Sequence, residues 1–161
     1  MTKQKSADRQ TGRVISQNKK AFHDYEILET FEAGMVLMGS EVKSLRDGRA
    51  NLKDSHAKIR SGEIFLFALH ISVYTNASYN NHEPERVRKL LLHKREIKRL
   101  VGKTVERGLT LVPLKLYFKD GKVKVELALA RGKKQYDKRE SLKRKEGARE
   151  MDRLRKRHEL A

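Results

Sequence analysis

The sequence predicts a mainly β fold with some α-helix, built as an antiparallel barrel of five or six short strands and followed by a basic C-terminal tail. Three observations predict it. Apolar and polar side chains alternate over short stretches, Gly-containing turns separate these stretches, and strands and helices do not alternate regularly along the chain. Regular alternation would favour a parallel sheet, whereas this pattern favours an antiparallel barrel.

The clearest element is a hairpin formed by residues 109–118 and 123–130. In the second segment, valine or leucine alternates with lysine, glutamate and alanine, which is the pattern of a half-buried strand. Asp120-Gly121 separates the two segments, and an Asp-Gly pair between apolar runs favours a tight hairpin turn. Pro113 cannot donate a hydrogen bond to a neighbouring strand, so it predicts an edge or a bulge in the first strand.

Further strands are expected nearer the N-terminus. Residues 57–60 and 63–68 flank Ser61-Gly62 and predict a second hairpin. Alternating apolar residues mark one strand, and another is expected at residues 35–38, after a turn at Gly34. The alternating residues of the first are Tyr25, Ile27 and Phe31.

Two helices are expected among these strands. Ser40 is a suitable N-cap for a short helix that ends at Gly48. A longer helical region is expected between Pro84 and Gly108, where apolar residues recur at spacings of three and four. Those residues are Leu90, Leu91, Ile97, Leu100, Val101 and Val105.

The distribution of charge and apolar residues divides the chain into three parts. The formal net charge is +17, and the last 30 residues hold 12 basic and 6 acidic side chains. That end is too polar to bury a core of its own. We expect a flexible basic arm at residues 1–17, a compact domain at 18–131, and a basic tail at 132–161. Acidic and basic residues at helical spacings, such as Glu140 with Arg144, predict that the tail is disordered when free and becomes helical in an anionic groove.

The composition argues against several classes of protein. The chain has no cysteine, so disulfides and thiolate metal sites are excluded. Its longest apolar run is six residues, 64–69, against about 18 for a membrane-spanning helix. No signal peptide is visible, so we expect a cytoplasmic protein that is not held in a membrane. The six histidines never recur at metal-binding spacings, and no phosphate-binding glycine loop occurs. We therefore expect no enzymatic activity, no catalytic residues, no cofactor and no metal.

The excess of positive charge indicates an anionic partner. Nucleic acid is the first candidate, and an anionic membrane surface is the second. Aromatic residues lie among basic ones at residues 23–25, 79–82 and 133–136, and such groups suit binding to RNA. Each aromatic taken singly could instead be a core or rim residue.

Four separated motifs carry a resemblance to a known family. They are G-S-E-V-K-S-L-R at residues 39–46, N-N-H-E-P-E-R-V-R-K-L-L-L-H at 80–93, the strand at 109–118, and K-V-K-V-E-L-A-L-A-R-G-K-K-Q-Y-D-K-R at 122–139. From about Asn18 to Arg139 the chain resembles the bacterial SsrA-binding proteins, also called small protein B. The resemblance implies a barrel of the oligonucleotide-binding type, of about six strands, with three flanking helices. It also implies binding to the tRNA-like part of transfer-messenger RNA and its delivery, with elongation factor Tu, to ribosomes stalled without a stop codon, which is trans-translation.

The resemblance further implies a set of RNA-binding residues in the domain. Glu32, Leu91 and His93 would contact or support the RNA, and alternatives remain for each. Leu91 could be a core residue, and His93 could cap a helix. Glu32 has the wrong sign for a phosphate, so it should accept hydrogen bonds from a base, a 2′-hydroxyl or a basic side chain. The remaining RNA-binding candidates are Asn18, Lys19, His23, Lys133 and Lys134.

For the tail, the resemblance implies entry into the empty messenger channel of the small ribosomal subunit. Tyr136 could stack on a base of the ribosomal RNA at the decoding centre, and Asp137 could orient its basic neighbours. The other candidates for the decoding centre and channel are Lys138, Arg139, Lys143 and Arg144. Two other functions fit the composition: a structural ribosomal protein and an RNA-modifying enzyme.

Overall fold

The computed structural model describes residues 12–77, 79–105 and 108–159. Its strands are β1 (Val14–Gln17), β2 (Tyr25–Met35), β3 (Ala50–Asn51), β4 (His56–Arg60), β5 (Glu63–Phe67), β6 (His70–Ile71), β7 (Arg88–Leu91), β8 (Leu109–Lys119) and β9 (Lys122–Gly132). Its helices are α2 (Lys19–Asp24), α3 (Gly39–Arg46), α4 (Lys94–Thr104) and α5 (Gln135–Glu159). In the described part of the chain, no helix is long and apolar enough to cross a membrane.

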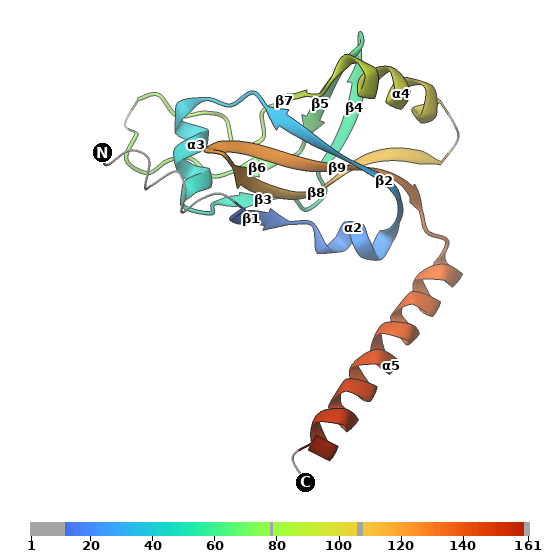
Figure 1. The fold of residues 1–161 in the computed structure, drawn as a ribbon. Coiled ribbons are helices and arrows are strands. Elements are labelled where there is room, and N and C mark those ends of the chain that lie inside the picture. Colours follow the sequence, from blue (N-terminus) through green and yellow to red (C-terminus); the bar gives the residue numbers. More distant parts are fainter. Residues whose placement is uncertain (1–11, 78, 106–107, 160–161) are drawn as a thin grey trace.

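Six antiparallel strands close into a barrel. Around the ring the order is β8, β4, β5, β7, β2 and β9, and β9 pairs again with β8. β1 pairs with β8 but is not one of the six strands of the ring, while β3 and β6 form a separate two-stranded sheet. α2, α3 and α4 lie around the barrel, and α5 extends away from it (Figure 1). The expected barrel of about six strands with three flanking helices is therefore confirmed.

Both predicted hairpins are present, and their turns explain why. Asp120 and Gly121 have φ angles of 51° and 72°, and Ser61 and Gly62 have φ angles of 49° and 74°. Two consecutive positive φ angles are typical of the tight turns whose twist matches paired strands, and glycine adopts them without steric cost. The register of β8 against β9 shifts between Pro113 and Lys115, so the bulge predicted from Pro113 is confirmed.

The expected turn at Gly34 is wrong, because β2 runs straight through it to Met35. Gly34 pairs with Lys124 of β9 on one side and with Leu91 of β7 on the other. A Cβ at Gly34 would lie 3.4 Å from the Cβ of Leu91. The glycine thus allows β7 to lie close to β2 at the point where the barrel closes.

The long helix expected between Pro84 and Gly108 begins only at Lys94. Leu90 and Leu91 belong instead to β7, where Leu90 pairs with Ile64 of β5 and is 1% exposed. The pairing of β7 with β5 and with β2 outweighs the helical spacing of these leucines. α4 keeps the C-terminal half of the predicted pattern, with Leu100 buried.

Two other boundaries differ from the sequence prediction. Val14–Gln17 form β1, which pairs with β8, so the barrel sheet begins within the segment expected to be a flexible arm. Residues 1–11 of that arm lie outside the described residues. The N-cap of α3 is Met38, and Ser40 lies inside the helix, where its hydroxyl lies 3.0 Å from Nδ1 of His82. The helix ends at Arg46, just before Gly48 with its φ of 73°, close to the predicted end.

The core has a main part inside the barrel and a smaller part beneath α2. Large aliphatic side chains and Phe118 fill the barrel. On the outer face of the sheet, Ala21 of α2 packs against Val112, Leu114 and Ala128. An alanine there lets the helix lie close to the strands. This second cluster fixes α2 across β8 and β9.

A buried ionic network ties α3 to the segment that leads into β7. Glu41 and Arg88 are both fully buried, and Oε1 of Glu41 accepts hydrogen bonds from Nε of Arg88 (2.8 Å) and of Arg86 (2.9 Å). The backbone amide of Met38 donates to the other oxygen at 2.7 Å. Burial raises the pKa of Glu41, but the donors from Arg86, Met38 and Arg88 outweigh it and hold the pKa below its usual value. The carboxylate is therefore ionised in the folded protein.

We expect Glu41→Gln to lower the free energy of unfolding by about 3–5 kcal/mol, because the substitution leaves Arg88 buried without its counter-charge. Urea unfolding at pH 7 measures the loss, and Glu146→Gln at an exposed position of α5 is the matched control. Because the pKa of Glu41 is lower in the folded state, its contribution is full above the unfolded pKa of about 4.3 and disappears as the pH falls through the folded value. A loss below about 1 kcal/mol at pH 7 would contradict this account.

Candidate nucleic-acid interface

Asn18 holds α2 in place and does not present its side chain to solvent. Its Oδ1 accepts from the backbone amide of Ala21 at 3.0 Å, and its Nδ2 donates to the carbonyls of Leu52 (3.3 Å) and Pro113 (3.2 Å). The residue is 6% exposed. All these bonds are internal, so the structure gives Asn18 a positioning role for the helix that follows it.

Two other candidates, Lys19 and His23, are exposed on α2. Nδ1 of His23 lies 2.8 Å from Oδ1 of Asp24, and this contact is the largest cause that lowers the pKa of Asp24. His23 is thereby held at the last turn of α2. A basic, hydrogen-bonding surface results at this end of the barrel.

Glu32 lies on the outer face of the barrel as an acceptor shared by two donors. The hydroxyl of Tyr117 donates to it at 2.5 Å, and Nζ of Lys119 lies 3.0 Å from both of its oxygens. These two bonds lower the pKa of Glu32, while burial and the bond to Glu32 raise the pKa of Tyr117. The expectation that Glu32 accepts a hydrogen bond from a basic side chain is met by Lys119.

Leu91 and His93 are also exposed, at the end of β7 and at the start of α4. Leu91 is 51% exposed at the end of β7, so the alternative of a core role is wrong. It borders a groove of about 430 Å³ that also includes Lys122 and Lys124. His93 is exposed and is the N-cap residue of α4, and its backbone amide donates to Glu96 at 3.0 Å.

The domain candidates therefore fall into two groups. Glu32 and Leu91 are brought together, because Gly34, two residues after Glu32, pairs with Leu91. Lys19 and His23 lie on α2. This helix ends where β2 begins, at the pair formed by Tyr25 and Gly132. Along β2 the seven steps from Tyr25 to Glu32 span roughly 23 Å. The two groups therefore lie toward opposite ends of β2.

Lys133 and its neighbours join the barrel to α5. The backbone amide of Lys133 donates to the carbonyl of Asp24 at 2.9 Å, and its amine donates to the carbonyl of Phe22 at 3.3 Å. Nζ of Lys138 lies 3.5 Å from Oδ1 of Asp24. These contacts, which we call the α2–α5 joint, fix the start of α5 at the end of α2. The amine of Lys133 is engaged within the joint, whereas Lys134 is exposed.

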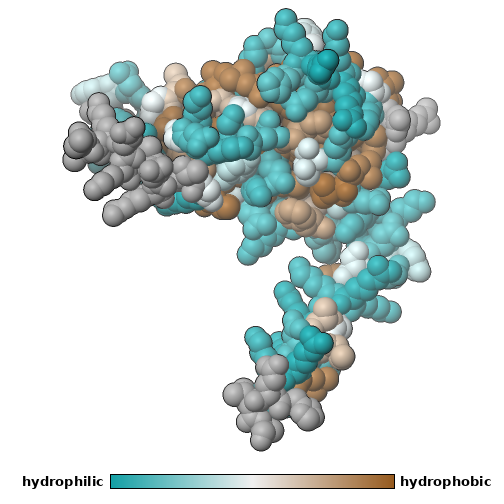
Figure 2. All heavy atoms as spheres, in the orientation of Figure 1, coloured by the Kyte–Doolittle hydropathy of each residue, from teal (hydrophilic) through white to brown (hydrophobic). Residues whose placement is uncertain are grey.

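Beyond the joint, α5 extends from the barrel as a mostly hydrophilic helix (Figures 1 and 2). Asp137 accepts a bond from the amide of Lys134 at 3.3 Å, which stabilises the first turn. Tyr136 is 74% exposed, and Arg144 pairs with Glu140 at 2.6 Å as the helical spacing predicts. The other tail candidates, Arg139 and Lys143, are exposed, and Lys138 is half-buried in the joint. That the tail is disordered in the free chain stays a prediction.

Sequence reasoning missed Tyr117, Lys119 and Asp24. The signal for Tyr117 is present, because it alternates with apolar positions of the strand expected at 109–118, whereas Lys119 lies one residue beyond that expected strand. Their convergence on Glu32 depends on the register of three strands, which local patterns do not fix. Among the described residues, no group of three or more acidic or histidine side chains could hold a metal ion.

Comparisons with known proteins match this chain to one family. The family model described as "SmpB protein" matches residues 15–157. An SsrA-binding protein of Syntrophobacter fumaroxidans is 74% identical over 157 residues, which are 98% of each chain. One from Geobacillus thermodenitrificans is 63% identical over 142 residues, 88% of this chain and 92% of that one. A solved structure described as "tmRNA-SmpB: a journey to the center of the bacterial ribosome" contains a chain with a TM-score of 0.63 and 56% identity, covering 74% of this chain and 84% of that chain.

We expect Asp24→Asn to loosen the start of α5 without unfolding the barrel, because it removes the charge that attracts Lys138 and His23. A pair of this exposure contributes about 0.2–1 kcal/mol, so amide hydrogen exchange in residues 136–141 should accelerate by a factor of about 1.4 to 5. Asp54→Asn, which breaks the pair with Lys20 at 2.8 Å, is the matched control and should leave α5 unchanged. Equal acceleration in both variants would show that the joint does not hold the helix.

Proposed function

The chain belongs to the SmpB family, and from this membership we propose that it binds transfer-messenger RNA and acts with it on the ribosome in trans-translation. The observation that carries the proposal is the extent of the match. It runs from residue 15 to residue 157 and so covers both the barrel and nearly all of α5. The protein would act as a binding factor and not as an enzyme, in the cytoplasm, where bacterial ribosomes lie.

The barrel would bind the tRNA-like part of the RNA. A basic face that bears ordered acceptors and an exposed apolar side chain suits a folded RNA, because phosphates, 2′-hydroxyls and unstacked bases are all available to it. Glu32 would act by holding Tyr117 and Lys119 in place or by accepting a hydrogen bond from the RNA, and Leu91 would contact a base or sugar. His93, Lys19 and His23 would extend the same contact, and Asn18 would act through α2.

The tail would enter the messenger channel. α5 is strongly polar, and the contacts that hold it to the rest of the chain lie in its first two turns, where Lys138 reaches Asp24 and Lys133 reaches Ser141. A helix of this kind gains little from packing on its own barrel and more from an anionic channel. Tyr136 would stack on a base near the decoding centre, with Lys134 and Arg139 beside it and Lys143 and Arg144 deeper in the channel. Elongation factor Tu would accompany the RNA in the delivery complex.

A chain that ends at Arg131 should keep its affinity for transfer-messenger RNA within about threefold and lose tagging of peptides on stalled ribosomes. The reason is that β9 up to Arg131 and the other strands of the barrel remain, so only the bonds of Gly132 and Lys133 to the end of α2 are lost with the part proposed to occupy the channel. Filter binding and a tagging assay in a reconstituted translation system measure the two activities. Parallel loss of both activities in a correctly folded truncation would contradict the division of labour.

Glu32→Ala should weaken binding to transfer-messenger RNA about tenfold, because it releases both Tyr117 and Lys119 and removes an acceptor. The matched control is Glu126→Ala, since Glu126 lies directly opposite Glu32 in the neighbouring strand. Both substitutions raise the net charge by one, so they change the general attraction to phosphates equally. Titration at several salt concentrations shows whether either variant also changes the number of phosphate contacts, because that number sets the slope of log K against log salt. Equal affinities of the two variants would remove Glu32 from the interface.

A further inference from the structure

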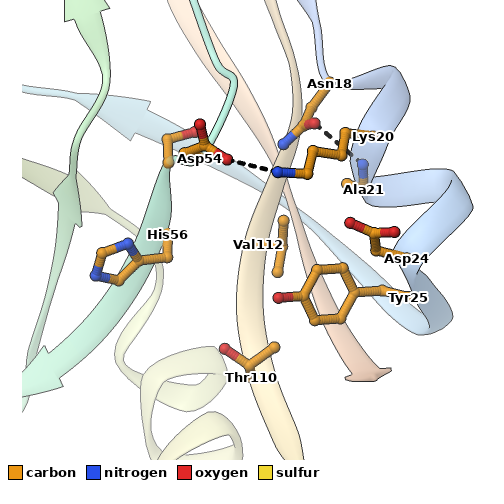
Figure 3. Close-up of a pocket in the computed structure, with 10 residues that line it drawn as sticks. Asn18, Lys20, Ala21, Asp24, Tyr25, Asp54, His56, Thr110 and Val112 are labelled. Atoms are coloured by element: carbon orange, nitrogen blue, oxygen red, sulfur yellow. Dashed lines mark hydrogen bonds and ion pairs between the residues drawn. The ribbon is translucent and has the colours of Figure 1, made fainter. Parts of the chain in front are cut away.

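A cavity that the proposed function does not use lies between α3 and the loop after β6. This α3 cavity is half-open and has a volume of about 360 Å³. Figure 1 shows α3 at the end of the barrel opposite α4 and the start of α5. The cavity drawn in Figure 3 is a different one, because Asn18 and Lys20 at α2 line it. The described residues that line the α3 cavity include none of those proposed above to contact RNA.

Ser40 lines the α3 cavity and is hydrogen-bonded to a histidine. Its Oγ lies 3.0 Å from Nδ1 of His82, and Nε2 of the same ring lies 2.9 Å from the carbonyl oxygen of Ile71. A carbonyl oxygen can only accept a hydrogen bond, so Nε2 carries a proton. In the neutral ring Nδ1 therefore accepts, and the hydroxyl of Ser40 donates to it. A serine paired in this way can transfer its proton to the histidine while its oxygen attacks an electrophile.

Neighbouring contacts fix both members of this pair. Glu41, next to Ser40, belongs to the buried ionic network described above. His82 is only 4% exposed, so a molecule in the cavity meets the serine and not the histidine. Asn81 fixes the loop beside His82, because its Oδ1 accepts from the amide of Tyr74 at 2.9 Å and its Nδ2 donates to the carbonyl of Tyr74 at 3.1 Å. A nucleophile and a base held in this way need little reordering before a reaction.

Lys43 and Tyr74 give the α3 cavity a cation and an apolar wall. Lys43 lies three residues after Ser40, so the two side chains share one face of α3. Its Nζ lies 5.4 Å from the ring centre of Tyr74, and both residues line the cavity with Met38 and Ala77. An ammonium group here favours a substrate with a negatively charged leaving group and stabilises the charge that develops during attack. The apolar wall suits a small acyl group.

We propose that Ser40 is a site of covalent modification by acyl transfer, with His82 as its base and a small acyl phosphate as the acyl donor. Oγ of Ser40 forms a bond to the carbonyl carbon, and the bond from that carbon to the phosphate oxygen breaks. The hydroxyl proton passes to Nδ1 of His82 and from there to the departing phosphate. The products are a hydrogen phosphate ion and Ser40 carrying the acyl group as an ester. This modification occurs once per chain and is independent of the RNA partner.

The first test is incubation of the full chain with acetyl phosphate, followed by mass spectrometry of its peptides. Acetyl phosphate also acetylates lysines, so each sample is measured before and after treatment with neutral hydroxylamine, which cleaves an ester and leaves an amide. We expect a hydroxylamine-sensitive acetyl group on the peptide that contains Ser40, and none on that peptide in Ser40→Ala. Ser141→Ala, which removes a hydroxyl from α5, is the matched control and should behave like the unchanged protein. Absence of the ester, or its persistence on that peptide in Ser40→Ala, would overturn the proposal.

A fluorophosphonate probe tests the nucleophile and its base without the acyl donor. The probe forms a bond from phosphorus to the oxygen of an activated serine and releases fluoride. His82→Gln keeps a donor for Ile71 but supplies no base, so labelling of Ser40 should slow about a hundredfold, since a positioned general base contributes about 10²–10⁴-fold. Thermal unfolding verifies that the variant is folded. The proposal fails if the unchanged protein is labelled no faster at Ser40 than at Ser141, or if the folded variant is labelled at the unchanged rate.

Lys43→Gln tests the choice of acyl donor. It should slow the acetylation of Ser40 by acetyl phosphate about tenfold, because an exposed cation stabilises the developing charge less than a buried donor would. Lys98→Gln removes the same charge from an exposed position of α4 and is the matched control. Equal rates of ester formation in the two variants would show that the cation does not act on the leaving group and would overturn the assignment of an acyl phosphate.

Discussion

Closure of the barrel through β2 is the constraint on which the other features depend. β2 is 11 residues long, pairs with β9 along most of its length, and changes to β7 at Gly34. Without that close approach the ring would open, and Leu91 would lose its place beside Glu32. The same strand begins where α2 ends and where β9 delivers the chain to α5. One strand thus sets the positions of the residues proposed to contact RNA, of the short helix α2 and of the start of α5.

The barrel offsets much of its charge internally. Glu29 pairs with Arg99 and Lys103, Glu126 pairs with Lys115, and Glu41 is buried with two arginines. Such pairing lets a small basic domain fold in spite of its net charge, because repulsion between neighbouring cations is reduced. In α5 the described apolar side chains Leu142, Met151 and Leu154 are 43%, 65% and 54% exposed, so that helix buries almost nothing. Core formation and the exposure of cationic surface are therefore divided between two parts of the chain.

The sequence predicted those elements whose signals are local. The turns at Asp120-Gly121 and Ser61-Gly62 require positive φ angles, and the residue types at these positions predict such turns. β7 was expected to be helical, because Leu90 and Leu91 fit a helical spacing and the pairing that makes them a strand comes from residues more than 25 positions away. The site follows the same rule. The polar types of its residues were predictable, but the convergence of Tyr117 and Lys119 on Glu32 depends on strand register.

Asn18 and Lys133 show the difference between a residue that contacts a partner and a residue that positions other parts of the protein. Both were expected to contact RNA, and both use their side chains within the protein, at the two ends of α2. Asn18 fixes the N-terminus of this six-residue helix to the barrel, and Lys133 ties its last carbonyls to the start of α5. A helix so short has little stability of its own, so its geometry is set by these attachments. The direction in which α5 leaves the barrel is therefore determined by the same helix that carries Lys19 and His23, and any RNA that repositions α2 must also redirect the tail.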